Sequence, residues 1–345
     1  MTGPARRALS ALTALVMIGT LFVGAPGPTY ANGGSVTYYV AQAGTPDGDG
    51  SSCTDPDFVG GDQTPIAAAA GSATDGDTIY ICAGTYLIEA TIDLVNELLT
   101  LQGAGAGVTT LDARGDTKIL TGTTVTVSGL TFSKGIGNVM NGGGAISGTT
   151  VTVTNSTFWH NETSGCDGEG ATGGAIRGET VTVTNSTFVG NEACSGGGAI
   201  SSTTVTVTNS TFIGNRAYVG GAIAGENLIV TNSTFVGNSA SLGGAVLAVS
   251  GGLITQSRFR SNTAIERGAA IAISMAPGYT VKLRGNVFTQ NAAPFGGAIT
   301  LQFCGMTGSR KKITLIKRTN RFVRNSATSQ QGTKNIENWV DGCPT

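Results

Sequence analysis

The chain has 345 residues, of which 54 are glycine and 9 are proline, and 40 % are hydrophobic. Glycine without a strict triplet period excludes collagen, and the hydrophobic content argues against a disordered chain. Charged residues make up 12 % of the sequence and the formal net charge is −1, so no overall electrostatic field favours nucleic acid or membrane lipid as a partner.

Residues 1–31 are predicted to be a signal peptide. Arg6 and Arg7 precede an apolar run from Ala8 to Val23, and Thr29-Tyr30-Ala31 fits a small-residue cleavage site. The run is shorter than the roughly 20 residues of a bilayer span. We therefore expect a secreted protein, extracellular or at the cell surface, with no transmembrane segment after cleavage.

Residues 32–120 are expected to form an N-terminal cap and the first turns of the fold. Pro65 to Ala73 is predicted to be a short alanine-rich helix with Thr64 as its N-cap. Such a helix would cover the open end of a stacked structure. The predicted strands of this region are Val36–Val40, Ile79–Ile81, Leu99–Leu101, Thr110–Leu111 and Ile119–Leu120.

Residues 121–325 repeat two motifs, each seven times. Phe-x-x-Asn starts at Phe158, Phe188, Phe212, Phe235, Phe259, Phe288 and Phe322. Gly-Gly-Ala-Ile or a close relative starts at Gly143, Gly173, Gly197, Gly220, Gly243, Gly268 and Gly296. In the most regular stretch the phenylalanines are 24, 23 and 24 residues apart, a period typical of stacked units that cannot bury their apolar faces alone.

One repeat, residues 197–220, shows how each unit is built. Residues 204–208 alternate threonine and valine, so Val205 and Val207 should point inward from a half-buried strand. Phe212 then returns an apolar side chain to the core. Three short strands and three bends in such a repeat form one turn of a parallel β-helix. We expect an all-β, single-stranded solenoid of about ten turns, closed by residues 326–345.

Two columns of asparagine are predicted at the bends. One consists of the Phe-x-x-Asn asparagines, and the other of Asn155, Asn185, Asn209 and Asn232. Asparagine suits turns, and stacked amides can form hydrogen bonds along a column. We interpret both columns as structural.

Six cysteines indicate an oxidising compartment. Two of them occupy corresponding loops one repeat apart, and stacked loops can meet within disulfide distance. None has Cys-x-x-Cys spacing, so metal or redox chemistry is not indicated. The expected disulfides are Cys166–Cys194, Cys53–Cys82 and Cys304–Cys343.

The paired motifs resemble the repeat of the polymorphic outer membrane protein family. Residues 76–81 with residues 83–86 resemble the cap and first turns of secreted right-handed β-helix proteins. The likeness covers about residues 36–325. It implies a right-handed parallel β-helix that acts as an adhesin-like module for a glycan or cell-surface ligand, and we expect a non-enzymatic monomer.

Polysaccharide-cleaving β-helix enzymes need clustered carboxylates. The strongest cluster here lies in the longest loop, residues 161–172, which is either a ligand site or a solvated loop held by a disulfide. The cluster consists of Glu162, Asp167 and Glu169. These three residues would be catalytic in the alternative function, a polysaccharide lyase or glycoside hydrolase with a degenerate site. The other predicted binding residues are Arg177, Arg310, Lys311 and Lys312.

A calcium site near the start of the predicted mature chain is a further hypothesis. Asp47, Asp49, Asp55 and Asp57 offer oxygen ligands for Ca²⁺, although an EF-hand's terminal glutamate is missing; no other cofactor is expected. The single histidine, His160, stands beside Trp159 inside a repeat, and no Ser-His-Asp triad is recognised in the sequence.

A threonine lattice suggests a second alternative function. Threonines at 150, 152 and 154 recur at 180, 182 and 184 and at 204, 206 and 208. The lattice resembles the surface of ice-binding β-solenoids, although threonine also simply suits an exposed strand.

Overall fold

The computed structural model describes residues 35–46, 48–94, 98–138, 142–165, 170–275, 281–303, 319–329 and 336–339. The chain divides into two units, residues 1–34 and residues 35–345. All described residues belong to the second unit, so the predicted signal peptide lies outside them.

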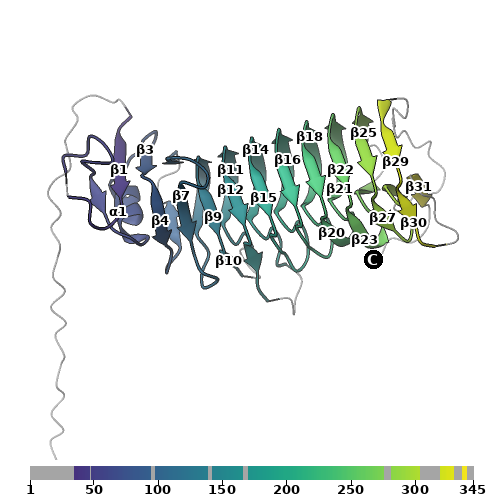
Figure 1. Cartoon of the computed structure of the whole chain (residues 1–345), viewed down its shortest axis with the longest axis horizontal. Coiled ribbons are helices and arrows are strands. Elements are labelled where there is room, and N and C mark those ends of the chain that lie inside the picture. The colour runs from purple at the N-terminus through teal and green to yellow at the C-terminus, as the bar shows by residue number, and fades with distance from the viewer. Residues whose placement is uncertain are drawn as a thin grey trace, which may run out of the picture. The chain divides into compact units, whose positions relative to one another are not determined.

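The described residues form a parallel β-helix whose coils follow one another in chain order (Figure 1). The largest sheet has 15 strands. They are β1 (Thr37–Ala41), β2 (Phe58–Val59), β3 (Thr78–Ile81), β5 (Ile92–Leu94), β6 (Thr100–Gly103), β8 (Leu120–Ser128), β11 (Ile146–Thr154), β14 (Ile176–Thr184), β16 (Ile200–Thr208), β18 (Ile223–Thr231), β21 (Val246–Thr255), β24 (Ile271–Met275), β25 (Val281–Arg284), β28 (Ile299–Phe303) and β31 (Ile336–Trp339).

A second sheet, of ten strands, carries the phenylalanines. Its strands are β4 (Gly84–Leu87), β7 (Thr109–Asp112), β9 (Thr131–Ser133), β12 (Thr157–Trp159), β15 (Thr187–Val189), β17 (Thr211–Ile213), β19 (Thr234–Val236), β22 (Arg258–Arg260), β26 (Val287–Thr289) and β29 (Arg321–Val323). The third side comprises β10 (Ile136–Gly137), β13 (Glu162–Thr163), β20 (Ser239–Leu242), β23 (Thr263–Arg267), β27 (Ala292–Ala293) and β30 (Ser326–Ala327).

The helix expected at the N-terminal end is present as α1 (Thr64–Ser72). It buries Pro65 and Ile66 in the core of the first coils. The prediction that Thr64 is its N-cap was wrong, because the helix begins at Thr64 and Gln63 occupies the cap position. The Thr64 amide donates instead to the Asp62 carboxylate, at 2.9 Å.

The expected disulfide between Cys53 and Cys82 is present, with their Cα atoms 5.7 Å apart. Cys194 is also disulfide-bonded. Its expected partner, Cys166, lies outside the described residues, as do Cys304 and Cys343.

A column of stacked phenylalanine rings fills the core. Consecutive ring centroids are 4.6 to 5.1 Å apart and the ring planes differ by at most 10°. The rings belong to Phe132, Phe158, Phe188, Phe212, Phe235, Phe259, Phe288 and Phe322. The regular stack has eight such coils, slightly fewer than the ten or so turns expected. Tyr86 and Leu111 hold the same row in the two opening coils before it.

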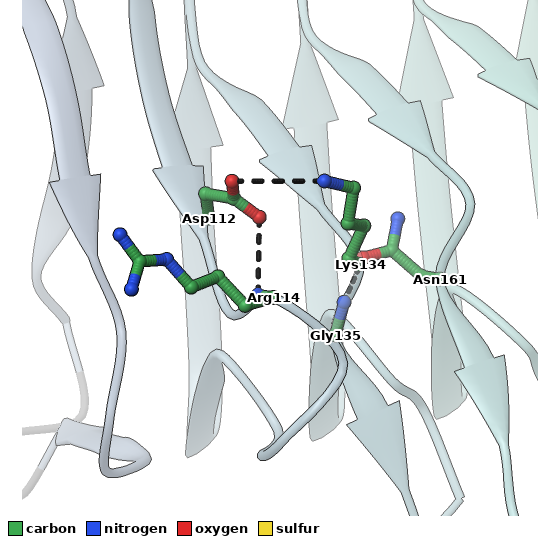
Figure 2. Close-up of polar contacts among 5 residues, drawn as sticks. All are labelled: Asp112, Arg114, Lys134, Gly135 and Asn161. Atoms are coloured by element: carbon green, nitrogen blue, oxygen red, sulfur yellow. Dashed lines mark hydrogen bonds and ion pairs between the residues drawn. The ribbon is translucent and has the colours of Figure 1, made fainter.

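The Phe-x-x-Asn asparagines form a buried ladder, as predicted. The Asn215 Oδ1 accepts hydrogen bonds from the backbone N–H and the Nδ2 of Asn191, at 3.0 and 2.9 Å. Its own Nδ2 donates to the Phe188 carbonyl, at 3.1 Å, and to the Asn238 Oδ1, at 3.0 Å. The ladder begins where Asn161 accepts from the Gly135 amide (Figure 2). From the coil of Asn161 to the coil of Asn325, each coil is thereby bonded to the next through buried amides.

The asparagines of the second column are exposed and adopt a left-handed backbone conformation at a turn. Asn155, Asn185, Asn209 and Asn232 have φ between 48° and 51°, in the left-handed region that asparagine tolerates better than most residues. This explains the recurrence of asparagine where the large sheet turns toward the phenylalanine sheet.

We predict that Asn215→Ala lowers the free energy of unfolding by about 3 kcal/mol, because it leaves buried polar groups of the adjacent coils without partners. Urea unfolding followed by circular dichroism measures the change. The matched control is Asn209→Gly, which keeps the left-handed turn and should alter stability by less than about 0.5 kcal/mol. Equal effects of the two substitutions would contradict a stabilising role of the buried ladder.

Candidate functional site

A groove of about 590 Å³ crosses five consecutive strands of the large sheet, β11, β14, β16, β18 and β21. It lies over the first half of each strand, directly after the Gly-Gly-Ala-Ile motif. The turn residues Thr172, Gly196 and Val219, which precede that motif, also line it. The groove therefore runs along the stack, from coil to coil.

Small residues form the floor of this groove. Gly148, Gly178, Ser202 and Gly225 occupy one register column. A Cβ added at Gly178 would lie 2.9 Å from the Val181 Cγ2 atom, and one at Gly225 would lie 2.7 Å from a Leu228 methyl group. Val181 and Leu228 are fully buried, so a larger residue at Gly178 or Gly225 would press against the core.

Polar side chains flank the floor on both sides. Arg177 and Ser201 stand in one column, and Glu179, Thr203 and Glu226 stand in the other. Ser202 belongs to the scaffold, because its hydroxyl donates to the carbonyl of Glu179 at 2.9 Å. The groove thus presents hydroxyl groups, one guanidinium and two carboxylates.

The family model described as a right-handed β-helix region matches residues 147–326, just over half of the chain. The chain belongs to the right-handed β-helix family. The match confirms the expected handedness, and the finer resemblance to the polymorphic outer membrane protein repeat stays a prediction. No curated protein matches the sequence.

One solved structure similar to this β-helix is described as Geobacillus virus E2 - ORF18. The two chains are 12 % identical, with a TM-score of 0.44. The alignment covers 71 % of this chain and 60 % of the viral chain, so it spans less than two thirds of that protein. Among the described residues of our chain, no helix is long and apolar enough to cross a membrane.

The structure separates the predicted binding residues. Arg177 lines the groove. Glu162 is exposed on the third side of the β-helix, where its backbone forms a parallel β-bridge with Glu192 of the next coil. The remaining predicted residues, Asp167, Glu169, Arg310, Lys311 and Lys312, lie outside the described residues.

Sequence reasoning missed the groove residues Ser201, Glu179 and Glu226. A signal for these residues is present in the sequence. It is the variation at the two positions on either side of the small floor residue, which is the second residue after the isoleucine of each motif. These positions vary between coils, as Ser-Gly-Thr, Arg-Gly-Glu, Ser-Ser-Thr and Ala-Gly-Glu, while the neighbouring motif remains nearly constant. Variable outward positions beside a constant scaffold indicate a surface that is free to acquire chemistry.

A second hollow, of about 490 Å³, contains Lys118 together with Asp116, Asn138 and Ser164. Burial lowers the pKa of Lys118 to about 8, and the positive charge of Arg177 contributes to the shift. Lys118 therefore lies close enough to the groove residue Arg177 for their positive charges to interact.

The single histidine lies in a small surface cluster. The His160 ring contacts the Trp159 ring edge-on, with centroids 4.2 Å apart, and the Lys134 Nζ lies 5.5 Å from the tryptophan ring centroid. Lys134 also reaches the Asp112 carboxylate at 4.0 Å, while the Arg114 amide donates to the other oxygen of that carboxylate (Figure 2). These contacts account for the cluster by packing and charge pairing.

The aspartates considered as Ca²⁺ ligands make hydrogen bonds to backbone amides. Asp55 accepts from the Asp49 amide at 3.0 Å, and Asp57 accepts from the Tyr39 amide at 2.7 Å. Hydrogen bonds from Ser51 and then from Asp55 lower the pKa of Asp49. Asp47 lies outside the described residues, and within the described part of the chain no three acidic, histidine or cysteine residues are grouped to hold a metal.

The threonine columns are in register on the outward side of β11, β14 and β16. In β18 the same columns continue with Asn227, Ile229 and Thr231. The lattice is therefore regular over these three strands and becomes mixed at the fourth.

We predict that Lys118 titrates near pH 8 and that Arg177→Gln raises its pKa toward 10.5, because removing a like charge favours the protonated form. NMR titration of ¹³C-methylated lysines reports both values. Since the pKa of the folded state lies below that of the unfolded state, burial of the charged lysine opposes folding below pH 8, and this contribution to stability recovers as the pH rises from about 8 to 10.5. A Lys118 signal that titrates with the exposed lysines would contradict the assignment.

Proposed function

We propose that this β-helix is a secreted binding protein that holds an extended glycan in its five-strand groove. The groove itself carries the proposal, because it is continuous across β11, β14, β16, β18 and β21 and is lined by side chains that hydrogen-bond hydroxyl groups. A ligand lying along it would span about four strand spacings, or roughly 19 Å. This length suits a chain of sugar rings better than a single small molecule.

The hydrogen bonding of the backbone at the groove favours a glycan over a peptide as the ligand. An extended peptide usually binds a sheet by adding a strand to a free edge. Strands β14, β16 and β18 are each paired on both sides with neighbouring coils. The backbone hydrogen-bonding groups at this groove are therefore already in use, and recognition must come from the side chains.

The composition of the walls matches the hydrogen-bonding needs of a sugar. Hydroxyl groups both donate and accept, the Arg177 guanidinium donates, and the carboxylates of Glu179 and Glu226 accept. The mixture of charges selects no strongly charged ligand. An exported protein would meet such chains as free polysaccharides or as cell-surface glycans, in keeping with an adhesin-like role.

One observation favours glycoside hydrolysis as a second candidate function. Glu179 and Glu226 lie in the same register column with one coil between them. Two coil spacings place their backbones about 9.6 Å apart. Inverting glycosidases separate their two carboxyl groups by roughly 6.5 to 9.5 Å, so this pair has nearly the spacing that such a mechanism uses.

We predict that Ser201→Trp, which fills the groove, weakens retention on the bound polysaccharide by at least about tenfold, because the ligand loses its place over the floor. Retention on a panel of neutral and acidic polysaccharides, measured together with the release of new reducing ends, reports binding and cleavage in one assay. The matched control is Thr206→Trp, on the same strand but outside the groove.

The outcomes separate the two functions. Retention without new ends, lost in Ser201→Trp and kept in Thr206→Trp, supports a binding protein. New ends that disappear in Glu179→Gln and in Glu226→Gln support hydrolysis. Retention that both tryptophan variants leave unchanged would show that the groove is not the binding site.

A further inference from the structure

A separate hollow, of about 440 Å³, opens on the third side of the β-helix. The turns that precede the Gly-Gly-Ala-Ile motif divide it from the five-strand groove, and the two share no lining residue. It extends over four consecutive coils, from Glu192 to Ile265. The side chains that line this hollow therefore need an explanation separate from that of the groove.

Two exposed apolar side chains, Tyr218 and Ile265, stand in the second and fourth coils of this hollow. Tyr218 is 57 % exposed and Ile265 is 74 % exposed. Ser241 lies between them, and its amide donates to the Tyr218 carbonyl at 2.8 Å. Since Tyr218 and Ile265 are two coils apart, their backbones are separated by about 9.6 Å. A short serine between two larger side chains leaves a slot, which we call the Tyr218 slot.

Charged and hydroxyl groups stand beside the slot. The Arg216 Nε lies 3.8 Å from the Glu192 Oε1, on the coil before. Ser239 and Thr263 continue the same column toward the C-terminal coils. An aromatic face therefore adjoins a guanidinium, a carboxylate and hydroxyls, all accessible to solvent.

We propose that the Tyr218 slot binds one ring of a neutral saccharide. A sugar ring has an apolar face of C–H groups that packs on an aromatic ring, and a rim of hydroxyls that needs both donors and acceptors. Tyr218 supplies the aromatic face, and Arg216 and Glu192 supply the donor and the acceptor. This site is independent of the proposed groove and would stand if the groove function failed.

The local charge selects a neutral ligand over an acidic one. Arg216 is paired with Glu192, and Glu162 occupies the neighbouring position in the same column. Two carboxylates and one guanidinium leave a net negative balance, which repels a uronate. The charged side chains of Arg216 and Glu192 are 70 % and 56 % exposed, so a ligand can reach both from solvent.

Calorimetric titration of the full chain, with its disulfides intact, tests the proposal. The probes are cellotetraose, xylotetraose and mannotetraose, with tetragalacturonate as the acidic comparison. We expect at least one neutral probe to bind. Tyr218→Ala should weaken that binding at least about tenfold, whereas Tyr218→Phe, which keeps the ring, should stay within about threefold of the original affinity.

Two further variants distinguish binding in the Tyr218 slot from binding in the five-strand groove. Ser241→Leu fills the slot without touching Tyr218 and should abolish the same binding event. Ser201→Trp alters only the five-strand groove and should leave it unchanged, so the slot and the groove are scored separately. The proposal is overturned if no neutral probe binds, if tetragalacturonate binds more tightly than every neutral probe, or if Tyr218→Ala and Ser241→Leu both leave the affinity intact.

Discussion

The spacing between neighbouring parallel strands determines most of this structure. Each coil adds a step of about 4.8 Å, and a residue at a given position must then contact the residue at the same position of the next coil. Phenylalanine meets phenylalanine with nearly parallel rings, and asparagine meets asparagine with complementary donors and acceptors. At the buried phenylalanine and asparagine positions, a side chain that packs against a copy of itself is strongly favoured, and this requirement explains why the two motifs recur so faithfully.

The surfaces with functional potential occupy the positions that escape this requirement. Outward side chains such as Arg177, Glu179 and Tyr218 contact solvent, so they can differ from coil to coil while the core repeats. The floor of the groove is an intermediate case, because Gly178 and Gly225 must remain small to avoid neighbouring atoms. A uniform scaffold can therefore carry a local site, and the chemistry of that site depends on a few coils only.

The core could be predicted from the sequence because the same spacing that builds it also appears as a period along the chain. The inward valines, the phenylalanine stack and the two asparagine columns were all derived in this way. The grooves could not be, since they depend on where the large sheet bends and on how far the turns rise beside it. Arg177 and Glu162 were both predicted as binding residues, yet the coil directs Arg177 into the groove and Glu162 to the third side.

The asparagine ladder has a polarity along the chain. In every step the backbone amide and side-chain amide of one asparagine donate to the side-chain oxygen of the asparagine that follows in the sequence. A coil completes its buried hydrogen bonds only when the next coil is in place, and an unpaired buried N–H is tolerated less well than an unpaired carbonyl. Removal of the C-terminal coils would therefore leave the backbone amide of the last remaining ladder asparagine unpaired, whereas removal of the N-terminal coils would leave a side-chain oxygen without its donors. The two ends of the ladder are thus not equivalent.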